Sequence, residues 1–191
     1  MSKLIFKKLY IFSSSEKLAR VVEFSEGKTM ITSSSVDGTD RGKSVIMKSL
    51  YHTMGADCFF EDKWDDTNKT YILLFTVGDS SYYIFRHAKL FKVFDGNKNL
   101  LFSSVRRHEL AEKLFDIFHF AVKLPVKQND DDEQGTDKLE ITPPAYNYLL
   151  YFVDQDKQYG SQFASFRNLG QYSNYKTNVL YYHFGAFDDT Y

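Results

Sequence analysis

Short runs of β-branched and aromatic residues alternate with polar residues through much of the chain, a pattern that is typical of half-buried strands. Three such runs lie before residue 34, and a stretch of turn-forming residues follows them. Two further pairs of runs flank Gly78-Asp79-Ser80-Ser81 and Asp95-Gly96-Asn97, which predicts two hairpins. Strands are therefore expected over residues 3–13, 20–24, 28–33, 71–77, 82–86, 92–94 and 100–102, with another over 146–153.

Other segments carry apolar residues at spacings of three and four, which is the period of a helix with one buried side. The first spans residues 44–54, and its Lys48, Ser49 and His52 fall between the apolar positions, so we expect them on the polar side. Gly55 follows as a C-terminal cap. Further helices are predicted over residues 106–120 and 161–169, and no element is predicted in the aromatic-rich segment 172–191.

The composition is that of an ordinary soluble domain. The 191 residues are 43% apolar and 26% charged with a net charge of −1, which suits one domain. The only cysteine, Cys58, excludes an internal disulfide framework and a cysteine-based zinc site. No apolar run approaches the ~20 residues that cross a bilayer. The first ten residues do not form a signal peptide, so we expect a cytoplasmic protein with no membrane partner. Residues 126–140 are polar and acidic and are expected to form a surface loop or a disordered insertion.

The strongest chemical signal is Gly42-Lys43-Ser44, the end of a phosphate-binding loop. In such a loop, backbone N–H groups at the start of a helix face the phosphates, the lysine neutralises them, and the serine hydroxyl binds Mg²⁺. The glycine lets the backbone approach without a clashing side chain. The strand expected over 28–33 precedes the loop and the expected helix begins at the lysine, which is the strand–loop–helix setting that this chemistry needs.

The loop departs from the full G-x-x-x-x-G-K-[ST] pattern. Asp37 occupies the first glycine position, and Gly38 can take that role in a loop one residue shorter. The alternative interpretation is a Gly-Lys-Ser helix start with a solvated lysine. The candidate nucleotide-binding residues are the loop and the first turn of the helix, namely Asp37, Gly38, Thr39, Asp40, Arg41, Gly42, Lys43, Ser44 and Val45.

Three stretches of the chain carry a resemblance to a known family: KLIFKKLYIF…ARVVEFSEGKTMIT, RGKSVIMKSLYHTMGAD and YLLYFVDQDKQYGSQFASF. They resemble the opening strands, the phosphate loop with its helix, and the glutamine loop of the ABC-type ATPase heads of SMC proteins, RecF and RecN. The layout is more similar still to the divergent SMC-like ATPases of bacterial genome-defence systems. The resemblance implies an α/β P-loop NTPase lobe with mixed and antiparallel sheets, and it implies ATP and Mg²⁺ as ligands.

Asp154 and Gln155 have two interpretations under this resemblance. In a glutamine loop, Gln155 reaches Mg²⁺ and the attacking water. In a Walker B strand over residues 148–154, Asp154 is the carboxylate linked to Mg²⁺. We favour the glutamine loop, because a glutamate follows the aspartate in a Walker B strand of the ABC type and Gln155 stands there instead. A third interpretation is a strand that ends in polar turn residues. Asp154 and Gln155 are the candidate catalytic residues, and Ser44 and Gln155 are the candidate metal ligands.

The sequence has no LSGG-like signature, no second apolar run ending in Asp-Glu and no coiled-coil heptads. In the family it resembles, these features lie in the C-terminal half, so the resemblance implies that residues 1–191 are the N-terminal lobe of a split head. The implied partners are the C-terminal half of the same head, a second head that dimerises with nucleotide, and DNA bound by the assembled complex.

The implied function is ATP binding in DNA repair, chromosome maintenance or anti-phage defence, with hydrolysis only in the presence of the missing half. Two alternatives stay open. One is a complete small P-loop kinase or NTPase, and the other is a non-catalytic interaction domain in which Gly-Lys-Ser is incidental.

Overall fold

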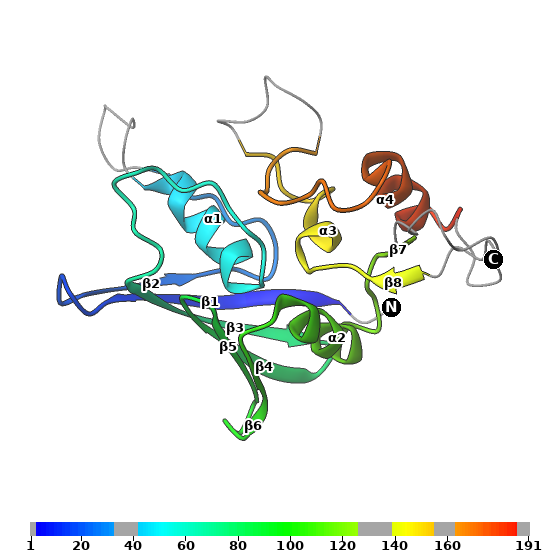
Figure 1. Ribbon diagram of the computed structural model, residues 1–191. Coiled ribbons are helices and arrows are strands. Elements are labelled where there is room, and N and C mark those ends of the chain that lie inside the picture. The colour runs from blue at the N-terminus through cyan, green and yellow to red at the C-terminus, as the bar shows by residue number, and fades with distance from the viewer. Residues whose placement is uncertain (1–2, 33–41, 126–138, 155–162, 187–191) are drawn as a thin grey trace.

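A six-stranded sheet forms the base of the molecule. The computed structural model describes residues 3–32, 42–125, 139–154 and 163–186 (Figure 1). The strand order is β2-β1-β3-β4-β5-β6, and every pairing between these strands is antiparallel. The strands are β1 (Leu4–Ser13), β2 (Leu18–Glu23), β3 (Lys69–Val77), β4 (Ser80–His87), β5 (Leu90–Asp95) and β6 (Leu100–Ser104).

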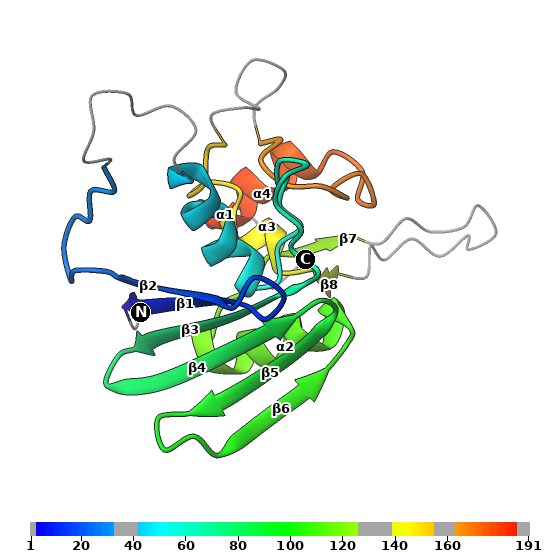
Figure 2. The same ribbon diagram turned by 90° about the vertical axis from the view of Figure 1, so that its left-hand side faces the viewer.

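One face of the sheet holds the core. Along β3, buried residues alternate with half-buried ones, so Tyr71 and Phe75 point into the core together. Helix α1 (Lys43–Thr53) and helix α2 (Arg107–Phe118) both pack on this face. The contact of α1 is the His52 ring against Tyr71, and that of α2 is Phe118 against Phe75. Figure 2 shows α2 behind the sheet and the near side of the sheet without a helix.

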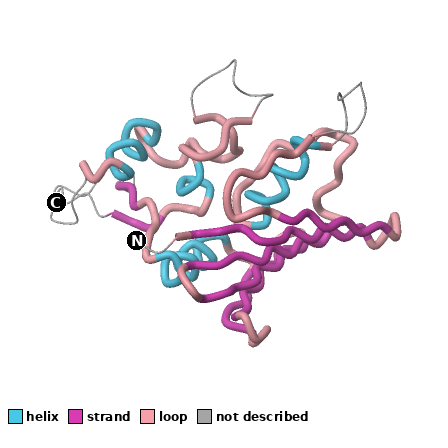
Figure 3. The backbone as a smooth tube through the Cα atoms, turned by 180° about the vertical axis from the view of Figure 1, so that it is seen from behind, coloured by secondary structure: helices cyan, strands magenta, loops and turns pink. Residues whose placement is uncertain are grey.

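A third group of short elements packs beyond these two helices. It consists of a hairpin of β7 (Lys123–Pro125) and β8 (Leu139–Ile141), followed by α3 (Ala145–Tyr148) and α4 (Tyr175–His183). Figure 3 shows this group from behind, at the end of the sheet nearest the N-terminus. Tyr146 anchors it, because its ring is fully buried and its hydroxyl donates to the Leu169 carbonyl at 2.7 Å.

The strands around both predicted hairpins and the helices predicted at 44–54 and 106–120 are confirmed, with ends shifted by at most two residues. Other expectations were wrong. Residues 28–32 form no strand, residues 163–169 form no helix, and the strand expected over 146–153 is α3 with a following turn. Pro144 lies at the start of α3, where its fixed φ suits a helix. Within the described residues the named sheets contain antiparallel pairings alone, so the mixed sheet of the expected fold is not found there.

The acidic insertion expected over residues 126–140 is wrong at its C-terminal end, since residues 139 and 140 belong to β8. Residues 126–138 lie outside the described part of the chain. Helix α4 was not predicted at all. Its side chains are mostly aromatic or polar, Val179 is its buried residue, and no apolar period marks it in the sequence.

Candidate functional site

The Gly-Lys-Ser motif lies at the start of α1. Gly42 is the residue before the helix, and its φ of 70° is in the left-handed region that glycine adopts without strain. A Cβ at Gly42 would meet no atom within 4 Å, so the backbone angle rather than crowding is what favours glycine. The Gly42 carbonyl accepts the first helical bond from the Ile46 N–H at 3.2 Å. The first turn of α1 therefore begins at Lys43, with its free N–H groups at this end.

A cavity of about 340 Å³ opens beside this turn. Its walls come from three separate parts of the chain: the first two turns of α1, residues 29–31, and the segment that follows α3. The lining residues are Thr29, Ile31, Lys43, Ser44, Met47, Lys48, Phe152, Val153 and Asp154. Lysine and serine from the motif thus share one cavity with an aspartate more than 100 positions away.

Lys48 and Asp154 form an ion pair at the base of this cavity. The Lys48 Nζ lies 3.3 Å from Asp154 Oδ2, and the two side chains are only 3% and 1% exposed. The backbone around Asp154 is also held, because its N–H donates to Ser165 Oγ at 3.1 Å and that hydroxyl donates to the Phe152 carbonyl at 2.8 Å. Burying two charges is costly unless they are paired, so removing either partner alone is expected to be strongly destabilising.

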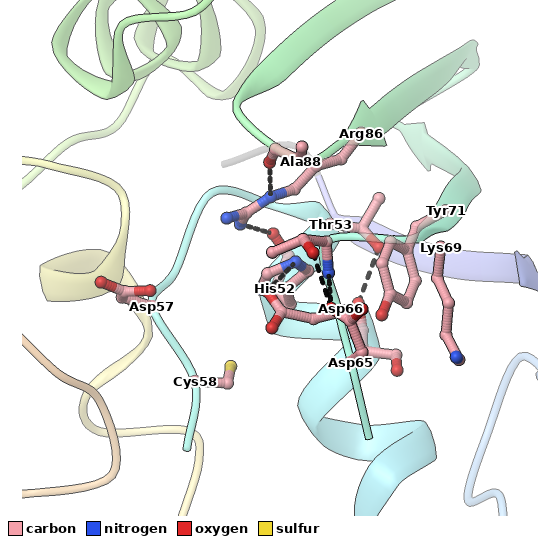
Figure 4. Close-up of polar contacts among 12 residues, drawn as sticks. His52, Thr53, Asp57, Cys58, Asp65, Asp66, Lys69, Tyr71, Arg86 and Ala88 are labelled. Carbon is pink, nitrogen blue, oxygen red and sulfur yellow. Dashed lines mark hydrogen bonds and ion pairs between the residues drawn. The ribbon is translucent and has the colours of Figure 1, made fainter. Parts of the chain in front are cut away.

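The opposite end of α1 is fixed by Arg86 from β4. The Arg86 Nη1 donates to the carbonyls of His52 and Ala56, the latter at 3.1 Å, and its Nε donates to the Ala88 carbonyl at 3.2 Å (Figure 4). A cation at the end of a helix satisfies its last carbonyls and matches the helix dipole. Burial lowers the pKa of Arg86 to about 10, which leaves it charged at neutral pH.

His52 is buried between the helix and the sheet. Its ring is 1% exposed, packs against Phe60 and Tyr71, and places Nε2 3.5 Å from the Asp66 carboxylate (Figure 4). Burial, with the positive charges of Arg86 and Arg107, lowers the pKa of His52 to about 2. The imidazole is therefore neutral at physiological pH, and it serves as a packing residue.

Of the predicted site residues, the structure brings Lys43, Ser44 and Asp154 to the same cavity, with Gly42 at the helix start and Val45 largely buried in the first turn. The others lie outside the described residues, namely Asp37, Gly38, Thr39, Asp40, Arg41 and Gln155. The Walker B interpretation of Asp154 required a strand over 148–154, and that strand is absent because residues 149–151 form a turn.

The sequence analysis did not identify Lys48 as a residue of the site. It predicted Lys48, Ser49 and His52 on a polar side of the helix, and this prediction was wrong. All three are at most 3% exposed, because the sheet covers α1 on one side and other side chains cover it elsewhere, namely Cys58, Phe60, Phe152 and Phe166. The available signal was a lysine five positions after Lys43 in a largely apolar helix. Such a residue needs a buried partner if the helix is enclosed.

Comparisons with known proteins give one informative match. No protein-family model matches the chain, and no solved structure matches it significantly. The Lamassu protein LmuB of Bacillus cereus (strain VD014) is 38% identical over 192 residues, covering all of this chain and 32% of LmuB. The chain is a homologue of part of LmuB. It spans about a third of the length of this relative.

Two further searches of the described residues concern other classes of site. No group of three or more His, Cys, Asp or Glu side chains lies close enough together there to hold a metal ion. None of the described helices has the length and apolarity needed to cross a membrane.

Proposed function

We propose that this chain binds Mg²⁺-ATP through Gly42, Lys43 and Ser44 as the N-terminal lobe of an SMC-like ATPase head that acts in anti-phage defence. The observation that carries the proposal is the cavity at the start of α1, which both motif side chains line together with Asp154. Gly42 in a left-handed conformation immediately before the helix is the backbone arrangement that turns N–H groups toward an anion.

The residues present fit a nucleotide phosphate. Lys43 supplies a positive charge, Ser44 supplies a hydroxyl suited to a hard cation, and the first N–H groups of α1 have no partner within the helix. Mg²⁺ would neutralise charge between the phosphates when bound. Since Asp154 is already paired with Lys48, we assign it to holding the cavity wall rather than to a direct role as metal ligand.

The defence role rests on similarity to LmuB, a protein of a Lamassu system. At 38% identity over the whole chain, a shared fold and a related role are expected, but two thirds of LmuB has no counterpart here. The partners of the proposed lobe therefore include the C-terminal half of the same head, a second head in the presence of nucleotide, and DNA bound by the complex. The location consistent with these partners is the cytoplasm.

Calorimetric titration of Mg²⁺-ATP tests the nucleotide site. We expect binding by the wild-type chain, a loss of at least tenfold in affinity for Lys43→Ala, and a weaker loss that depends on Mg²⁺ for Ser44→Ala. The matched control is Lys89→Ala, an exposed lysine in the turn between β4 and β5, which should bind as the wild type does.

Two results would change the assignment. Equal affinity for wild type and Lys43→Ala, or no binding at millimolar nucleotide, favours the interaction domain with an incidental motif. Turnover by the isolated chain at ordinary enzyme rates of ~1–1,000 s⁻¹ favours a complete small NTPase or kinase instead.

A further inference from the structure

The face of the sheet opposite α1 and α2 is apolar. Antiparallel sheets with one face in the core usually present polar side chains on the other. Here the half-buried and exposed positions that alternate with the core residues are mostly aromatic or aliphatic. We call this surface the outer face; its large apolar residues are Tyr10, Phe12, Ile72, Leu74, Tyr83, Phe85, Leu90 and Phe94. None of them belongs to the core cluster or packs against it.

The register places the outer-face residues in three rows that run across strands β1, β3, β4 and β5. In strand order, the rows are Lys8-Leu74-Tyr83-Phe94, then Tyr10-Ile72-Phe85-Lys92, then Phe12-Thr70-His87-Leu90. The middle of the six-stranded sheet lies between β3 and β4. The central pair is apolar in the first two rows and polar, Thr70-His87, in the third. Each row has an aromatic residue at one end.

This pattern is complementary to itself. A two-fold axis between β3 and β4, parallel to the strands, places β1 of one copy over β5 of the other and β3 over β4. Ile72 then faces Phe85, Leu74 faces Tyr83, and Phe12 faces Leu90. Lys8 faces Phe94 and Lys92 faces Tyr10, so both lysines meet aromatic rings, a favourable cation–π arrangement.

No like charges face each other directly in this arrangement. Lys8 is also bonded to Glu23 of β2 at 2.7 Å, so its charge is compensated within its own copy.

The area is sufficient for a weak but specific dimer. The rows continue onto β2 at Glu23, Val21 and Ala19 and onto β6 at Leu100 and Ser103. Six strands about 4.8 Å apart and three rows about 6.8 Å apart then cover roughly 550 Å² per copy. The total of roughly 1,100 Å² just exceeds the area expected of a biological interface. The arrangement of the two copies also resembles the aligned packing of two sheets in a sandwich, in which the strand directions differ by only about 30°.

We propose that the outer face is the interface of a homodimer in which two copies of this chain pack sheet on sheet about a two-fold axis parallel to β3 and β4. This dimer does not involve the cavity at the start of α1, so it forms without nucleotide. It is a contact separate from the nucleotide-dependent pairing of heads under the proposed function.

Sedimentation velocity of the nucleotide-free chain from 1 to 200 μM tests the proposal. We expect a reversible dimer that Ile72→Glu and Phe85→Lys each weaken at least tenfold, because each puts a charge against an apolar residue of the other copy. The matched control is Phe184→Glu, which adds a charge at an exposed apolar position at the end of α4, away from the outer face, and should leave the dimer intact.

Mixing the two variants separates a lost interface from a lost fold. In a mixed dimer, Glu at position 72 of one copy faces Lys at position 85 of the other, and the remaining pair is the native Ile72 and Phe85. Equal amounts of Ile72→Glu and Phe85→Lys should therefore regain dimer that neither variant forms alone. A wild-type monomer at 200 μM, a dimer that both variants retain, or a mixture that stays monomeric overturns the proposal and leaves the face to a different protein.

Discussion

The ion pair between Lys48 and Asp154 gives the most direct test of how the cavity is held. Replacing Lys48 with methionine keeps the length of the side chain and removes the charge, which leaves the Asp154 carboxylate buried at 1% exposure without its cation. Breaking a buried pair on one side costs about 3–5 kcal/mol. The entropy of unfolding of a 191-residue chain is about 0.4 kcal/mol per degree, so the melting temperature should fall by about 8–12 °C.

The assay is urea unfolding followed by circular dichroism, on four proteins: wild type, Lys48→Met, Asp154→Leu and the double variant. We expect each single variant to lose about 3–5 kcal/mol and the double variant to recover most of that loss, since no unpaired charge then stays buried. Lys89→Met is the exposed control and should change the stability by less than ~0.5 kcal/mol. The reasoning is refuted if a single variant costs less than ~1 kcal/mol, or if the two losses simply add.

Three further predictions concern α1 and its C-terminal end. The pKa of His52 is about 2 in the folded chain and ~6.5 in the unfolded one. The contribution of His52 to the free energy of unfolding is therefore complete above pH ~6.5 and falls by ~1.4 kcal/mol per pH unit below it. Urea titrations from pH 7 to 4.5 should show a loss of ~2.7 kcal/mol that His52→Gln lacks. Arg86→Met should cost about 3 kcal/mol by the same measurement, because the carbonyls of His52 and Ala56 each lose a hydrogen bond from a buried cation, and Arg86→Lys should restore only part of it. Gly55→Ala should cost about 2–4 kcal/mol, since φ is 96° there and the new Cβ would lie 2.8 Å from Leu110 Cδ2; a change below ~0.5 kcal/mol would contradict this.

The four inner strands of the sheet, β1, β3, β4 and β5, could be predicted from the sequence because each buries alternate residues. In β3, buried and half-buried residues alternate without interruption, and the turn at Gly78-Asp79 fixes the pairing of Val77 with Ser80. The same reasoning failed at residues 146–153. Tyr146, Tyr148 and Leu149 are all buried, and the segment is apolar apart from Asn147. Such a run does not separate a strand from a short buried helix.

The candidate site was predictable in part, for a related reason. Gly42, Lys43 and Ser44 are local to one turn, so a motif can carry them. Lys48 and Asp154 are brought together only by the packing of residues 152–154 against α1, which no local pattern records. The assumption that a helix has one polar side also failed for α1, because tertiary structure encloses it on every side along its middle.

The position of the Gly42-Lys43-Ser44 motif therefore depends on residues that are distant from it in the sequence. Helix α1 begins at Gly42 with a glycine angle, is held at its middle by an ion pair to Asp154, and ends against Arg86 of β4 and the close contacts of Gly55. Three anchors along an 11-residue helix leave little freedom for its N-terminal turn to shift relative to the cavity wall. A substitution at Arg86 or Asp154 should then weaken the proposed binding of nucleotide without touching the ligand, whereas one at the exposed Lys89 should not. Comparison of these variants at equal folded fraction separates an effect on the geometry of the cavity from simple loss of stability.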